Sequence, residues 1–187
     1  MIKENTVLYI LRIALMLLLI TSVMAAALSL VNGITAPRIA AIQAEKTQEA
    51  IQAVLPGGGE QVSCIADSTG LVEEAYAGEN GYAVKVTPIG FDNTVTMMVG
   101  VGKDGRVLGI SIISHTETAG LGAVAAAKNS AGEAFRGQFV GLSEAVAVTK
   151  DGGSLDAISG ATITSRAICQ GVSAALAFVA ENFPEVA

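Results

Sequence analysis

The feature that most constrains this chain is an uncharged, mostly apolar run of 24 residues from Ile13 to Ala36. A helix that crosses the hydrocarbon core of a bilayer needs about 20 such residues. Lys3 and Arg12 precede the run and Arg38 follows it, which leaves a modest excess of basic residues on the N-terminal side. Because cytoplasmic flanks carry the excess of Lys and Arg, we predict a single-pass protein of the cell membrane with a cytoplasmic N-terminus and an outer domain.

A cleaved signal peptide is the alternative interpretation of this run. Ala25, Ala26 and Ala27 offer a small-residue cleavage site, but the run is longer than the roughly 7–15 residues of a signal-peptide core. We therefore expect three parts in the chain. The cytoplasmic N-terminus and transmembrane helix occupy 1–37, a connecting helix and linker occupy 38–59, and the outer domain occupies 60–187.

The outer part has the pattern of an α+β domain. Alternating and β-branched runs predict strands near 61–66, 71–77, 81–89, 94–102, 106–113 and 144–149. Apolar residues at helical spacing predict helices at 38–54 and 162–182, and an Ala-rich stretch predicts a third at 123–137. Lys103-Asp104-Gly105 is the expected hairpin turn. Strands that come before most of the helices favour a mostly antiparallel sheet with flanking helices.

Composition and charge exclude several classes of function. The net charge is −6, and no basic run with interleaved aromatic residues is present, so nucleic-acid binding is not expected. Cys64 and Cys169 stand far apart and neither belongs to a metal-binding spacing, so no metal site is predicted, while a disulfide stays open. No acid–base pair or nucleophile triad is evident, and no catalytic residue is predicted.

The segment 156–165, Asp-Ala-Ile-Ser-Gly-Ala-Thr-Ile-Thr-Ser, lies where a loop turns into the last predicted helix. The first turn of a helix has unpaired N–H groups and the positive end of the helix dipole, so it accommodates a phosphate. Gly160 and Ala161 keep bulk away from an incoming group. Further hydroxyl donors come from Ser159, Thr162, Thr164 and Ser165. The alternative is that these residues are ordinary helix caps.

Lys150 precedes this segment by a short glycine-containing loop. A cation at this position would offset part of a phosphate charge. A solvated loop lysine is the competing interpretation, because isolated surface charges contribute little.

The residues Asp156-x-x-Ser159-Gly160-Ala161-Thr162 resemble the flavinylation motif of the FMN-binding domain family, which includes the G subunits of Rnf ion-translocating oxidoreductases. The resemblance implies that Thr162 carries one covalent FMN through a phosphoester. It also implies that a separate flavin transferase attaches this FMN, taking it from FAD, and that Asp156 belongs to the sequence which the transferase recognises.

A second segment, from His115 to Gly122, is similar to the Glu-Thr-Pro-Gly-Leu-Gly stretch of the same family, with Ala119 in place of proline. The resemblance implies that this loop lies against the flavin. It adds four residues to the expected site: Glu117, Thr118, Leu121 and Gly122. Two motifs in the right order are more specific than either alone, and the match is better to the Rnf G subunits than to the larger C subunits of sodium-pumping NADH:quinone reductases.

The resemblance implies an electron-transfer subunit of a membrane-bound, ion-translocating ferredoxin:NAD oxidoreductase. Its expected partners are the other membrane and peripheral subunits of that complex and, during maturation, the flavin transferase. In such a subunit the cofactor carries the redox chemistry and the protein supplies position and electrostatics, so the chain alone is not expected to oxidise NADH. An anchored binding or assembly subunit without redox work is the alternative.

Overall fold

The computed structural model describes residues 2–62 and 67–183, with side chains from Thr6 onward. The chain divides into two compact units after Glu45. The elements are α1 (Ile2–Val54), β1 (Glu60–Val62), β2 (Val72–Gly78), β3 (Gly81–Val86), β4 (Thr96–Gly102), β5 (Val107–Ser114), the 3₁₀ helix η1 (Gly122–Ala126), α2 (Ser130–Gly137), the 3₁₀ helix η2 (Thr149–Asp151) and α3 (Thr162–Asn182). The predicted α+β class is confirmed.

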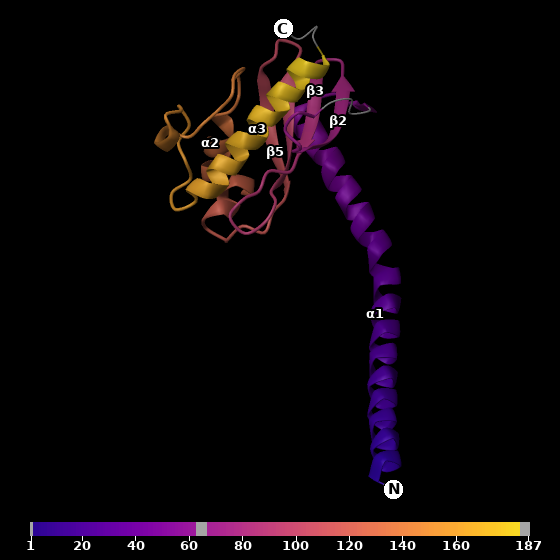
Figure 1. Ribbon diagram of the computed structural model, residues 1–187. Coiled ribbons are helices and arrows are strands. Elements are labelled where there is room, and N and C mark those ends of the chain that lie inside the picture. The colour runs from indigo at the N-terminus through magenta and orange to yellow at the C-terminus, as the bar shows by residue number, and fades with distance from the viewer. Residues whose placement is uncertain (1, 63–66, 184–187) are drawn as a thin grey trace. The chain divides into compact units, whose positions relative to one another are not determined.

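The first unit consists of the long N-terminal part of α1, drawn in indigo and violet (Figure 1). The helix continues through Pro37, as expected for a connecting helix that extends the apolar run. By length and composition it can cross a membrane, and none of its most apolar window is buried. α3 meets the same criterion, but 67% of its window is buried, so it is a core helix of the second unit.

The second unit is built on a five-stranded antiparallel meander in the order β1-β2-β3-β4-β5. The predicted hairpin between β4 and β5 is confirmed: Gly102 donates to the Arg106 carbonyl over 2.7 Å, and Gly105 has a φ of 72°. The first predicted strand is described as β1 over Glu60–Val62, and its positions 63–66 lie outside the described residues.

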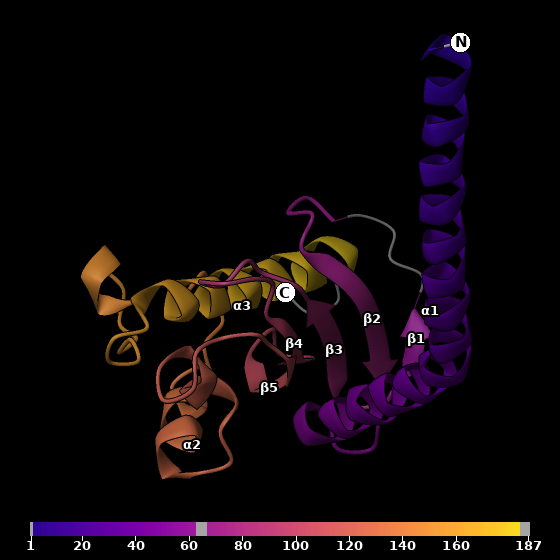
Figure 2. The ribbon, with the colours of Figure 1, turned by 90° about the horizontal axis from the view of Figure 1, so that it is seen from below.

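Two apolar layers cover opposite faces of this sheet, because successive side chains of a strand point to opposite sides. On one face α3 lies across the strands and packs on Val84, Val86 and Val99 (Figure 1 and Figure 2). The buried face of α3 is the predicted one: Ile168, Val172, Ala175, Leu176 and Val179. On the other face the last turn of α1 packs on Tyr76, Ala83 and Met98.

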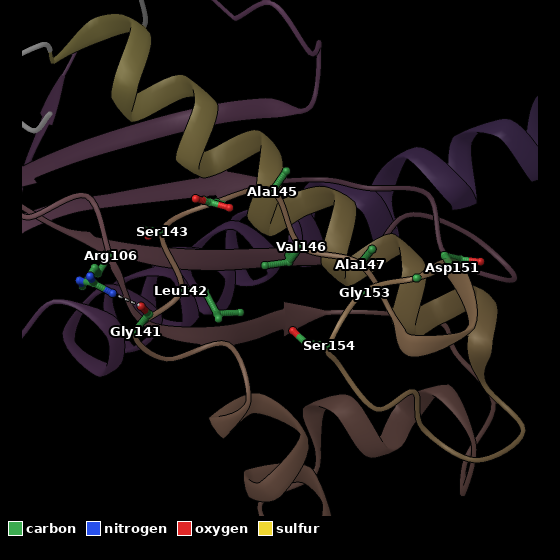
Figure 3. Close-up of a pocket in the computed structure, with 12 residues that line it drawn as sticks. Arg106, Gly141, Leu142, Ser143, Ala145, Val146, Ala147, Asp151, Gly153 and Ser154 are labelled. Carbon is green, nitrogen blue, oxygen red and sulfur yellow. Dashed lines mark hydrogen bonds between the residues drawn. The ribbon is translucent and has the colours of Figure 1, made fainter.

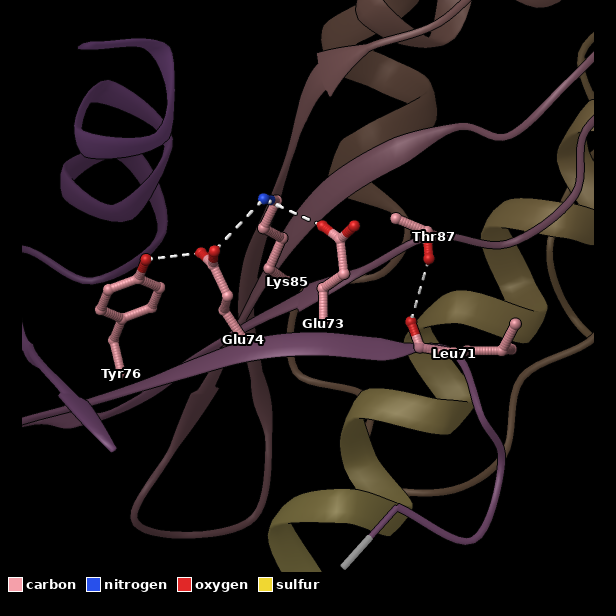
Figure 4. Close-up of polar contacts among 6 residues, drawn as sticks. All are labelled: Leu71, Glu73, Glu74, Tyr76, Lys85 and Thr87. Atoms are coloured by element: carbon pink, nitrogen blue, oxygen red, sulfur yellow. Dashed lines mark hydrogen bonds and ion pairs between the residues drawn. The ribbon is translucent and has the colours of Figure 1, made fainter. Parts of the chain in front are cut away.

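A polar network lies on β2 and β3 beside this second apolar layer (Figure 4). Lys85 Nζ lies 2.9 Å from a Glu73 carboxylate oxygen and 3.7 Å from Glu74. The Tyr76 hydroxyl donates to Glu74 over 2.7 Å. Burial, with the adjacent Glu74 carboxylate, raises the pKa of Tyr76 to about 12, so the phenol stays protonated and keeps this hydrogen bond at physiological pH.

Two predicted elements are wrong in detail. The single helix expected at 123–137 is two helices, η1 and α2, because the Asn129 side chain accepts from Gly132 N–H over 2.9 Å and starts a new helix. The strand expected at 144–149 is only an isolated bridge between Val148 and Leu155. The Val146 N–H donates to Ser173 Oγ on α3 over 2.9 Å and so does not join a strand ladder.

Candidate functional site

The site begins at the first turn of α3, where the predicted anion-binding segment ends. Gly160 adopts a φ of 73°, in the region that glycine tolerates best, and the Ala161 N–H donates to the Ile158 carbonyl over 2.9 Å. α3 starts at Thr162 with Ala161 as its N-cap, and no side chain caps the helix. The interpretation of the Ser/Thr cluster as an ordinary helix cap is therefore wrong. The first-turn amides of α3 lack the side-chain acceptor that most helix starts provide.

Ser165 is buried and holds the turn before the helix in place. Its hydroxyl donates to the Ala161 carbonyl over 3.0 Å and accepts from the Ile158 N–H over 3.0 Å. Because both interactions are made within the protein, this residue shapes the loop and does not supply the free hydroxyl donor expected from the sequence.

The loop that follows β5 meets α3 through one buried carboxylate. Glu117 is 8% exposed, and its Oε2 accepts from the Thr164 hydroxyl over 2.6 Å. Its Oε1 accepts from the Phe91 N–H over 2.8 Å. A Cβ on Gly90 or Gly122 would collide with these carboxylate oxygens, so both positions require glycine. Glu117 therefore joins three segments that are distant in sequence.

A short turn on the other side of the helix start carries Lys150. Its Nζ lies 3.2 Å from Thr162 Oγ1, so the structure brings together the predicted cation and the predicted attachment hydroxyl. The turn is tied to α3 by a bidentate ion pair in which Arg166 donates to both oxygens of Asp151 over 2.6 Å. The hydrogen bond and charge of Arg166 hold the pKa of Asp151 below its usual value.

These segments enclose a pocket of about 280 Å³. Its lining is Phe91, Glu117, Thr118, Leu121, Gly122, Lys150, Gly160, Ala161, Thr162, Ile163 and Thr164. Nine of these eleven positions are in the set expected from the sequence. Phe91 and Ile163 are additions: Ile163 is an apolar residue beside a motif and carries no signal of its own, and Phe91 lies outside both motifs.

Asp156 and Ser159 lie apart from the pocket that contains Thr162. Both line a neighbouring depression of about 600 Å³, together with residues of α2. The backbone of Asp156 is held by Gln138, whose Oε1 accepts from the Asp156 N–H over 2.7 Å, and the Asp156 side chain is exposed. This placement leaves the Asp156 carboxylate accessible from outside the pocket.

A further depression, of about 460 Å³, lies between Arg106 and Asp151 (Figure 3). Arg106 is engaged there by the Gly141 carbonyl, to which it donates over 2.8 Å. Most of the remaining lining is backbone and small side chains, such as Ala145, Ala147 and Gly153. It contains none of the motif residues, and we assign the site to the smaller pocket.

The smaller pocket combines an uncapped helix start, an ammonium group and apolar walls. Such a combination suits a ligand with a phosphate at one end and an apolar ring system at the other. The fold and the site thus define a domain that binds a phosphate-bearing aromatic cofactor.

Comparisons with known proteins identify that cofactor class and the family. Residues 90–177 match the FMN-binding domain. The G subunit of the ion-translocating oxidoreductase complex of Methanosarcina acetivorans is 31% identical over 180 residues, which cover 90% of this chain and 93% of the relative. The G subunit of the Na⁺-translocating ferredoxin:NAD⁺ oxidoreductase complex of Acetobacterium woodii is 35% identical, with 87% of each chain covered. The G subunit from Pseudomonas aeruginosa is also 35% identical, over 92% of this chain and 89% of its own length.

The chain therefore belongs to the family of G subunits of ion-translocating oxidoreductase complexes and carries an FMN-binding domain. The residues of the pocket fit FMN. The first-turn amides of α3 and the Lys150 ammonium would suit its phosphate, and Leu121 and Ile163 would offer apolar contact to its ring system.

Proposed function

We propose that this protein is the membrane-anchored electron-transfer subunit of an ion-translocating ferredoxin:NAD oxidoreductase and that it carries one FMN on Thr162. The observation that carries the proposal is the position of the Thr162 hydroxyl. It stands on the first residue of α3, beside uncapped amides and 3.2 Å from Lys150 Nζ, in a pocket of the FMN-binding domain. FMN supplies the redox chemistry, and the protein supplies its position and electrostatic environment.

The attachment follows from the chemistry of a threonine hydroxyl and a flavin transferase that uses FAD. The Thr162 oxygen bonds to the flavin-side phosphorus, the phosphoanhydride bond of FAD breaks, AMP leaves, and the hydroxyl proton passes to solvent. The phosphodiester that results keeps one negative charge. Lys150, whose Nζ lies 3.2 Å from Thr162 Oγ1, and the positive end of the α3 dipole would stabilise that charge. Asp156, whose side chain is exposed, belongs to the sequence that the transferase recognises.

The proposed partners are the other subunits of the complex, and the proposed topology places the N-terminus in the cytoplasm and the FMN-binding domain outside. The basic residues Lys3 and Arg12 before the apolar run of α1 support this orientation. Protease added to spheroplasts should remove the domain of a protein tagged at its N-terminus and leave the tag protected. A domain that resists protease until the spheroplasts are opened contradicts the topology.

Intact mass under denaturing conditions tests the attachment. The full chain produced with a flavin transferase should gain the mass of one FMN minus one water, and its gel band should fluoresce. Thr162→Ala should lose both signals and keep its far-UV circular dichroism. Thr116→Ala, which removes the hydroxyl of an exposed loop threonine, is the matched control and should keep both. Covalent flavin in the Thr162→Ala protein contradicts the assignment.

A further inference from the structure

Phe91 is an exposed aromatic side chain at the site that belongs to neither sequence motif. It lies in the connection between β3 and β4, its side chain is 67% exposed, and it lines the pocket that contains Thr162. Among the described residues after Glu45, six large apolar side chains are exposed, and three of them line this pocket: Phe91, Leu121 and Ile163. Exposed apolar side chains that gather at one pocket indicate a contact surface, whereas single scattered ones do not.

The backbone of Phe91 is held in place although its ring is exposed. Its N–H donates to Glu117 Oε1 over 2.8 Å, and the preceding Gly90 N–H donates to the Asn93 carbonyl over 2.8 Å. The connection closes where the Val95 N–H donates to the Pro88 carbonyl over 2.8 Å. The fixed backbone preorganises this position for a ligand, because only the rotamer freedom of the exposed ring remains to be lost on binding.

The carboxylate that holds the Phe91 backbone is also hydrogen-bonded to the helix that carries Thr162. The second oxygen of Glu117 accepts from Thr164 Oγ1 over 2.6 Å, and Thr164 lies in the first turn of α3. One buried carboxylate thus links the aromatic residue and the attachment helix, with no side chain on Gly90 or Gly122 between them. The link sets the position of Phe91 with respect to anything bound at Thr162.

We propose that Phe91 forms an aromatic wall of the flavin site and that Glu117 is the positioning residue that holds this wall beside Thr162. The proposal rests on the function proposed above and extends it to two residues. A flavin ring is planar and largely apolar, and aromatic pairs stabilise each other by offset or edge-to-face contact. Glu117 acts through Phe91 and Thr164, because both of its carboxylate oxygens already accept hydrogen bonds within the protein.

The chain contains no tryptophan, so a single introduced tryptophan is a clean probe of contact with the flavin. The variants are Phe91→Trp and, as the matched control, Ile89→Trp. Ile89 lies in the same connection and is 72% exposed, but it does not line the pocket. Both are made in the full chain, co-produced with the flavin transferase and purified in detergent. The intact mass of each preparation first establishes that FMN is attached, so a failure of attachment is seen separately from a failure of contact.

Contact quenches flavin fluorescence, because an indole ring against a flavin transfers an electron to its excited state. We expect the fluorescence of attached FMN to fall by at least about fivefold in Phe91→Trp and to change by less than about twofold in Ile89→Trp. Equal fluorescence of the two flavinylated tryptophan variants overturns the proposal. Loss of a partner protein on purification, with unchanged fluorescence, also overturns it and assigns Phe91 to a protein contact.

Glu117→Gln in the Phe91→Trp background tests the positioning role. The glutamine keeps the size of the side chain, but its NH₂ group cannot accept a hydrogen bond, so one of the two links is lost. We expect fluorescence to recover by at least about twofold at equal flavin content, with Thr164→Val giving a smaller recovery. Unchanged quenching in a folded, flavinylated double variant refutes the role of Glu117 and leaves the aromatic wall to be judged by the first comparison.

Discussion

On one side of the site, Glu117 is 8% exposed and accepts two hydrogen bonds, whereas on the other side Asp151 and Arg166 form an ion pair whose side chains are 37% and 51% exposed. Both interactions attach a loop to the first turns of α3. Removing a buried acceptor leaves its donors without partners and destabilises the fold. An exposed ion pair contributes little to stability, because water and salt compete with it. We therefore expect the loop that carries Phe91 to keep a fixed position relative to α3 and the turn that carries Lys150 to be able to shift.

Glu117→Ala is expected to have the largest effect on stability of the changes that test this contrast. It leaves the Phe91 N–H and the Thr164 hydroxyl without their acceptors, and we expect a loss of about 3 kcal/mol in the free energy of unfolding. Chemical denaturation of the full chain in detergent measures this loss, with Glu144→Ala as the control at an exposed carboxylate. Equal denaturation midpoints in the two variants would show that Glu117 is not a structural hub.

Gly122→Ala tests the same side without removing any hydrogen-bonding group. The added methyl would meet Glu117 Oε2 and lie 2.6 Å from Thr164 Oγ1. Relieving such overpacking costs about 1–3 kcal/mol. Gly109→Ala is the control, because a Cβ there has no neighbour within 4 Å. If both alanines leave the denaturation midpoint unchanged, the packing around the carboxylate is looser than the structure indicates.

The body of α3 and the site illustrate what the sequence could and could not predict. The periodicity of Ile168, Val172 and Val179 predicted the bounds and the buried face of the helix, because burial and helical spacing produce the same pattern. The two wrong elements depend on hydrogen bonds between side chain and backbone, made by Asn129 and Ser173. Such bonds have no period, and they compete with regular structure in ways that residue type alone does not reveal.

The candidate site was predictable to the extent that motifs mark it. The structure places Lys150 beside Thr162 and the Glu117 loop in the same pocket, while Asp156 and Ser159 line a separate depression. Phe91 could not be found from the sequence. It reaches the site through a long-range bond to a carboxylate 26 positions away, which only the folded chain displays.

Cys169 reports whether changes at the Glu117 side stay local. Burial raises the pKa of this thiol to about 11, so it is a neutral thiol at physiological pH. A raised pKa favours the folded state below the unfolded thiol pKa, and this contribution is lost as pH rises toward about 11. Native protein at neutral pH should leave Cys169 unlabelled by iodoacetamide, as read by peptide mass mapping, and Gly122→Ala should do the same. Labelling of Cys169 in that variant would mean that the whole α3 core opens.

Asp151→Asn should have the smallest effect on stability. Its effect on flavin attachment should depend on salt concentration, and this dependence is informative. The variant removes the charge that holds Arg166 but leaves Lys150 and Thr162 intact. We expect no measurable change in the denaturation midpoint and a slowing of flavin attachment of about twofold at low salt, which disappears at high salt because exposed pairs are screened.

The pH dependence separates a charge effect from a change of shape at the Lys150 turn. The pKa of Asp151 is lowered, so any stabilisation by its carboxylate is fully present above its unfolded pKa and is lost only as the pH falls through the lower folded value. Attachment rates of the native chain and Asp151→Asn, followed by intact mass, should therefore keep a constant ratio from about pH 5 to about pH 8. If flavin attachment to Asp151→Asn stays slow at high salt, the Asp151 side chain sets the geometry of the turn. Both sides of the site would then be held by specific contacts, and they would differ only in how strongly.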